Sequence, residues 1–187
     1  MIITPKLTPE VLIETPRRGP AIPSPNGSKA LYTCSTHIIG GDTLAELRLL
    51  DIATGSTQRL TDSSKVHSAT WLAEDEVVYL ESREEGLTQL KVLSLCWNDG
   101  GHLRQVDTSI AAVFPAPVRN LKVLGLGVRR VALAVVGRVD SDGNLFNEET
   151  IEKKSSVRVY DTFHFRFVSS SSSFMYGLTS DAKLIVQ

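Results

Sequence analysis

Few residues of this chain are of a type and spacing that could do chemistry. It has four histidines, His37, His67, His102 and His164. None is paired with another at the spacing of metal ligands, and each lies in an expected strand or at the edge of a repeat. We therefore expect strand or surface positions for all four, rather than roles as bases or ligands.

A serine nucleophile is also missing from the sequence. The 187 residues contain no Gly-x-Ser-x-Gly, the strained strand-to-helix turn that presents the nucleophile in α/β-hydrolases. Serines are common, but a Ser-His-Asp set can be selected from any such sequence, so selecting one would have no predictive value. The sequence assigns no catalytic, cofactor-binding or metal-ligating residue, and we expect no cofactor.

The two cysteines, Cys34 and Cys96, are far apart, and neither belongs to a Cys-x-x-Cys motif or has a histidine at ligand spacing. This spacing supports neither a zinc site nor a redox pair. We expect two buried thiols that pack as small apolar side chains.

Two acidic pairs, Glu84-Glu85 and Glu148-Glu149, have a type that suits a cationic ligand, because an ammonium group prefers a charge-assisted carboxylate partner. The alternative, which we favour, is that both pairs lie in solvated loops. Asn26-Gly27-Ser28 matches a glycosylation sequon, but an Asn-Gly turn explains it without a sugar.

Composition and charge limit the class of partner. The formal net charge is −1, and no run of five or more like charges occurs, so we expect neither nucleic acid nor a membrane as a partner. The first 12 residues contain prolines and charges where a secretory signal would need an unbroken apolar stretch. The chain as written is expected to be cytoplasmic. The alternative is secretion, if the true amino terminus is missing.

An internal repeat gives the fold class. Residues 44–52, "LAELRLLDI", match residues 87–95, "LTQLKVLSL", and turn residues follow both copies at 53–56 and 98–101. Another hairpin pattern precedes each copy, with Asn26-Gly27 as the first turn and Glu74-Asp75 as the second. Each repeat is therefore four strands in about 45 residues, which is the spacing of β-propeller blades.

We predict an all-β chain, a partial β-propeller of about three four-stranded antiparallel blades. Three blades cannot close a ring, since propellers have about four to eight, and the open edge is expected to favour self-association. The predicted divisions are an amino-terminal extension at 1–18, blades at 19–63, 66–108 and 114–166, and a serine-rich tail with one candidate hairpin near Ser180-Asp181 at 167–187.

Longer motifs resemble one family. Residues 7–36, the Asp-x-x-Thr-Gly turn with "RLTD", "APVRNLKV", "DGNLFNEET" and "VRVYD" resemble the amino-terminal propeller of dipeptidyl-peptidase V, a secreted fungal serine peptidase of the prolyl oligopeptidase family. The resemblance covers about residues 7–166. It implies a propeller that caps a carboxy-terminal α/β-hydrolase domain. That domain would carry the Ser, Asp and His of the triad and remove dipeptides from the amino termini of peptide substrates.

The sequence departs from the family pattern near its end, where Arg166 is followed by Phe167-Val168 and a serine run instead of an Arg-His-Trp-Asp segment. Under the resemblance, the acidic pairs invite comparison with residues that related dipeptidyl-peptidases use to bind a substrate's amino group. The leading hypothesis is a propeller fragment of such a peptidase, inactive by itself because it lacks the triad. The alternatives are a stand-alone propeller-type protein-binding module and a truncated, non-functional gene product.

Overall fold

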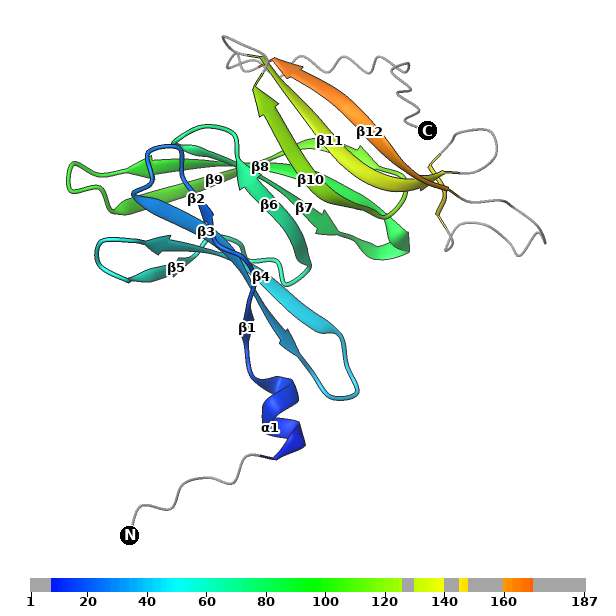
Figure 1. Cartoon of the computed structure of the whole chain (residues 1–187), viewed down its shortest axis with the longest axis horizontal. Helices are drawn as coiled ribbons and strands as arrows, with labels where there is room; N and C mark the ends of the chain where they lie inside the picture. Colours follow the sequence, from blue (N-terminus) through cyan, green and yellow to red (C-terminus); the bar gives the residue numbers. More distant parts are fainter. Residues whose placement is uncertain (1–7, 126–129, 140–144, 148–159, 170–187) are drawn as a thin grey trace. The chain divides into compact units, whose positions relative to one another are not determined.

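The computed structural model describes residues 8–125, 130–139, 145–147 and 160–169. The chain divides into two compact units, Met1–Val66 and His67–Gln187. The strands of both units and helix α1 are labelled in Figure 1.

The first unit contains one antiparallel sheet preceded by a short helix. Helix α1 begins after Thr8, whose hydroxyl oxygen accepts a hydrogen bond from the Val11 amide. The strand order is β1-β3-β4-β5, and β2 also pairs with β3. The elements are α1 (Pro9–Glu14), β1 (Arg17–Arg18), β2 (Ile22–Pro23), β3 (Lys29–His37), β4 (Thr43–Asp51) and β5 (Thr57–Arg59).

The predicted turns of the first sheet are confirmed, and side-chain oxygens hold them. The Asn26 side-chain oxygen accepts hydrogen bonds from the Ser28 amide at 2.7 Å and the Ser24 hydroxyl at 2.9 Å. One Asp51 carboxylate oxygen accepts from the Thr54 amide at 2.8 Å and from its hydroxyl at 2.9 Å. Gly55 follows with φ of 72°, a backbone conformation that favours glycine.

The second sheet is a four-stranded antiparallel meander in the order β6-β7-β8-β9, as a propeller blade requires. The 3₁₀ turn η1 (Glu84–Gly86) joins its two central strands. Strand β9 continues to Phe114, past residue 108, where the sequence placed the end of the second blade. The strands are β6 (Val66–Trp71), β7 (Glu76–Ser82), β8 (Thr88–Trp97) and β9 (Leu103–Phe114).

The repeat seen in the sequence has the same strand register in both sheets. Tyr32 lies opposite Arg48 in the first sheet, and Tyr79 lies opposite Lys91 in the second. Cys34 and Glu81 take the next positions along the same faces of their strands, because side chains alternate between the two faces of a sheet. The two sheets are therefore two copies of one structural unit.

The third sheet has the order β10-β11-β12 within the described residues. Its strands are β10 (Val118–Gly125), β11 (Arg130–Val139) and β12 (Tyr160–Ser169). Strand β12 includes Phe167, Val168 and Ser169, which the sequence assigned to the tail. The candidate hairpin near Ser180-Asp181 lies outside the described residues.

One apolar cluster forms the core of the second unit. Leu80 and Leu90 belong to the second sheet, Leu121 and Leu133 belong to the third, and all four are 4% exposed or less. The cluster consists of Val78, Leu80, Leu90, Val92, Ala112, Val118, Leu121, Leu133 and Val135. The two sheets thus pack face to face, as neighbouring propeller blades do, and the predicted all-β partial propeller is confirmed.

We expect Leu90→Ala to lower the free energy of unfolding by about 2 to 5 kcal/mol, because it leaves a cavity in this cluster. Val113→Ala is the control, since Val113 is 54% exposed and its truncation removes little buried surface. Urea denaturation followed by circular dichroism measures both. Equal losses of stability for the two variants would contradict the assignment of Leu90 to the core.

Candidate functional site

The acidic turn between β7 and β8 contains Glu84, Glu85 and Gly86, the region of the first predicted acidic pair. Glu85 has φ of 59° and Gly86 has φ of 68°, so two successive residues adopt the left-handed conformation. The side chains of Glu84 and Glu85 are exposed. The turn therefore presents two carboxylates to solvent from a tightly specified backbone.

A single buried side chain of the third sheet's connection holds this turn. Asn147 is 3% exposed, and its amide nitrogen donates to the Glu85 carbonyl at 2.8 Å and to the Pro115 carbonyl at 3.0 Å. Residue 147 immediately precedes the second acidic pair, which lies outside the described residues. The structure thus places Asn147, the residue just before the second acidic pair, against the backbone of the first acidic pair. The 62-residue separation gives no local signal for this contact.

Gly86 shows how closely Asn147 approaches the turn. A Cβ atom on Gly86 would lie 2.5 Å from the Asn147 side-chain oxygen, closer than nonbonded atoms can approach. Asn147 cannot move away without losing its hydrogen bonds to Glu85 and Pro115. Position 86 therefore requires glycine for two reasons: its φ is positive, and no Cβ atom fits beside Asn147.

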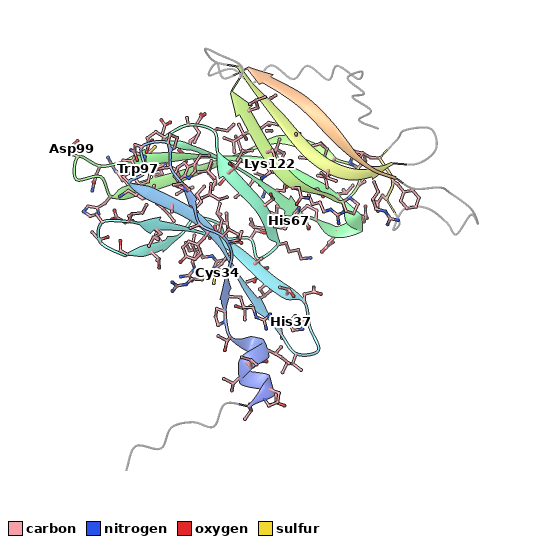
Figure 2. All side chains as sticks on the ribbon, viewed as in Figure 1. Cys34, His37, His67, Trp97, Asp99 and Lys122 are labelled. Atoms are coloured by element: carbon pink, nitrogen blue, oxygen red, sulfur yellow. The ribbon has the colours of Figure 1, made fainter. Side chains whose placement is uncertain are left out.

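Three further side chains join the second and third sheets by hydrogen bonds to the main chain. The His67 Nε2 lies 2.8 Å from the Val118 carbonyl oxygen, and the Thr88 hydroxyl accepts from the Val118 amide at 3.2 Å. The Ser68 hydroxyl accepts from the Leu121 amide at 3.1 Å. His67, labelled in Figure 2, therefore has a structural role in the second unit.

The other three histidines, for which strand or surface positions were expected from the sequence, lie in strands or at a turn. His37 is exposed at the end of β3, with Nδ1 2.9 Å from the Thr43 hydroxyl. His102 is exposed in the β8–β9 turn, and His164 lies in β12, opposite Val135. No group of three or more His, Cys, Asp or Glu side chains that could hold a metal ion occurs among the described residues.

The expectation of two buried thiols was wrong. Cys96 is exposed, and Cys34 is half-buried. Cys96 is on the same side of β8 as Ser94, which is also exposed, because side chains alternate along the strand and that side is uncovered near the β8–β9 turn. Apolar alternation predicted the strand but not how far along it the cover extends.

A hollow of about 400 Å³ lies on one face of the first sheet, and the sequence reasoning did not find it. We call it the arginine hollow, since three of its lining residues are Arg18, Arg48 and Arg59. Cys34, labelled in Figure 2, also lines it. The remaining lining residues are Pro16, Tyr32, Thr36, Leu44, Ala45, Glu46 and Ser64.

One carboxylate, Glu46, binds two of the three arginines. Its Oε1 accepts from the Arg48 Nε at 2.5 Å, and its Oε2 lies 3.2 Å from the Arg59 Nε. The hydrogen bond that Arg48 donates to Glu46 raises the pKa of Arg48 above its ordinary value. Arg18 instead places its guanidinium 5.8 Å from the centre of the Tyr32 ring, a cation–π contact.

Comparison with known proteins finds sequence relatives of this chain. Dipeptidyl-peptidase 5 of Aspergillus fumigatus is 32% identical over 165 residues, which are 86% of this chain and 22% of that protein. The probable dipeptidyl-peptidase 5 of Emericella nidulans is 30% identical over 165 residues, with the same coverage of both chains. The chain is related to the dipeptidyl-peptidase 5 family. The resemblance stated from the sequence motifs is thus confirmed.

The chain spans 22% of the length of these dipeptidyl-peptidase 5 relatives. A solved acylaminoacyl peptidase from Pyrococcus horikoshii matches its fold with a TM-score of 0.58 at 9% identity, over 89% of this chain and 26% of that one. At this identity the match shows the fold alone. No protein family model matches the chain, and no helix in the described residues is long and apolar enough to cross a membrane.

We expect Gly86→Ala to destabilise the chain by at least about 1 kcal/mol more than Gly101→Ala, because only the first change also forces a clash. Gly101 is the matched control, since its φ of 72° resembles that of Gly86 but no atom lies within 4 Å of its added Cβ. Urea denaturation of the two variants measures the difference. Equal losses would show that Asn147 yields without cost.

The Asp51 turn predicts a pH dependence in the first unit. The hydrogen bond from Lys29, together with those from Thr54, lowers the pKa of Asp51 well below its usual range. A lowered pKa in the folded state stabilises the fold above the unfolded pKa of about 4, and this contribution is lost as the pH falls further.

We therefore expect Asp51→Asn to reduce the loss of stability between pH 7 and pH 2. Asp99→Asn is the control, because Asp99 is an exposed residue of the β8–β9 turn (Figure 2). Urea midpoints measured across this pH range test the prediction. An unchanged pH profile in Asp51→Asn would contradict the ion pair with Lys29.

Proposed function

We propose that this chain supplies propeller blades of a dipeptidyl-peptidase 5-like serine exopeptidase. The enzyme of this proposal removes dipeptides from the amino termini of peptides. The similarity of 86% of the chain to proteins named dipeptidyl-peptidase 5 is the observation that carries the proposal. The packed, propeller-like sheets of the second unit support it.

Within this proposal the blades limit access to the reaction. A propeller over a hydrolase site excludes large folded substrates and helps to position short peptides. The sequence contains no Gly-x-Ser-x-Gly, so the proposal assigns the nucleophile to polypeptide outside these 187 residues. The acidic turn at Glu84-Glu85 is exposed, and its interpretation as a solvated loop remains the simpler one.

The test uses the native gene product. An antibody raised against the blades is applied to an extract that is also labelled with a fluorophosphonate probe for active serines. We expect both to mark one band several times heavier than the 20.4 kDa of this chain. Extract treated beforehand with phenylmethylsulfonyl fluoride provides the unlabelled control. Protein that the antibody precipitates from extract treated with neither reagent should release dipeptides from dipeptidyl nitroanilides.

A single unlabelled band near the mass of this chain would contradict the proposal. It would favour the alternatives of a stand-alone binding module or a truncated, non-functional product. Analytical ultracentrifugation of that product then separates these two, because a folded module with open sheet edges is expected to associate with itself or with a partner.

A further inference from the structure

The arginine hollow has an unbalanced charge. Three guanidinium groups and a single carboxylate line it, which leaves two positive charges in excess. Glu46 is already bound to Arg48 and Arg59. No ion pair joins Arg18 to a carboxylate in the part of the chain that the structure describes. A ligand that brings its own carboxylate would balance this charge.

The second sheet shows what the corresponding position can hold. There Glu81 is 2% exposed, and its carboxylate lies 2.7 Å from the Lys91 Nζ and 3.3 Å from the Arg83 Nε. In the shared register, Cys34 stands in the first sheet where Glu81 stands in the second. The face of such a sheet thus accommodates a carboxylate beside a basic residue at this position.

In the first sheet the carboxylate lies on the opposite strand. Glu46 lies opposite Cys34 on β4, at the position that Gln89 takes in the second sheet. The thiol of Cys34 is shorter than a glutamate side chain and carries no carboxylate. The hollow therefore includes the position at which the second sheet has the Glu81 carboxylate. Arg48 and Arg18 line the same hollow.

We propose that the arginine hollow binds a peptide through one of its carboxylate side chains. A volume of about 400 Å³ is within the range of ligand sites. A hollow of this size accommodates one side chain and the adjacent backbone. It is open to solvent, so the rest of the peptide extends outside it. Arginine suits this role because its planar fork binds a carboxylate through two parallel hydrogen bonds. This inference goes beyond the proposed function and does not depend on it.

The experiment measures protection of Cys34 in the full chain. Neutral N-ethylmaleimide labels the thiols in the presence and absence of a tetraglutamate peptide at low salt. Trypsin then releases Cys34 and Cys96 in separate peptides for mass spectrometry, because Lys29, Arg48, Lys91 and Arg104 bound them. We expect tetraglutamate to slow labelling of Cys34 by about threefold or more, a modest effect suited to a half-exposed site. Labelling of the exposed Cys96 should not change.

Two neighbouring arginines provide matched variants. Arg18→Gln should abolish the protection, whereas Arg17→Gln should retain it, because Arg17 is the other residue of β1 and does not line the hollow. In the unmodified chain, salt at about 1 M should remove the protection by screening the charges. This second measurement needs no variant to fold.

Four results would overturn the proposal. Two are no protection by tetraglutamate and protection that Arg18→Gln leaves intact. The third is equal protection by inorganic phosphate at the same ionic strength, which would show a general anion site without preference for a carboxylate-bearing peptide. The fourth is equal protection by tetraglycine, which has a terminal carboxylate but no side-chain carboxylate, and it would show that the hollow does not recognise a carboxylate side chain.

Discussion

The second unit depends on the burial of one apolar face of each sheet against the other. A sheet cannot keep leucine and valine side chains in water without losing the free energy that their burial provides, about 25 cal/mol per Å². The second and third sheets solve this together, with Leu80 and Leu90 on one side and Leu121 and Leu133 on the other. The alternation of side chains then fixes which residues of every strand face away from this core.

Burial of those faces also requires polar partners for the main chain at the sheet ends. His67, Ser68, Thr88 and Asn147 provide them, each by a side chain from one segment that reaches the backbone of another. Buried peptide groups without partners would cost the free energy of their lost hydration. The Asn147 bond to the Glu85 carbonyl also fixes the acidic turn, so the two exposed carboxylates of Glu84 and Glu85 stand on a backbone that a distant segment of the chain holds.

The two repeated sheets differ in how they place charge on equivalent faces. In the second, Glu81 is buried with Lys91 and Arg83 around it. In the first, the Glu46 carboxylate is on the opposite strand, Cys34 takes the position equivalent to Glu81, and Arg18 adds a further cation. Internal repetition therefore preserves the strand register while the side chains on it vary.

The sequence by itself determined the strands, the turns and the repeat, because these depend on local alternation and on residues such as Asn26-Gly27 and Thr54-Gly55 whose backbone preferences are local. Only the tertiary structure decided which faces are covered. It exposed Cys96, placed Asn147 on the Glu85 carbonyl, and gathered Arg18, Arg48 and Arg59 around one hollow. These features join residues from separate strands and sheets. Period-two patterning assigns a residue to a face, but it carries no information on what packs against that face.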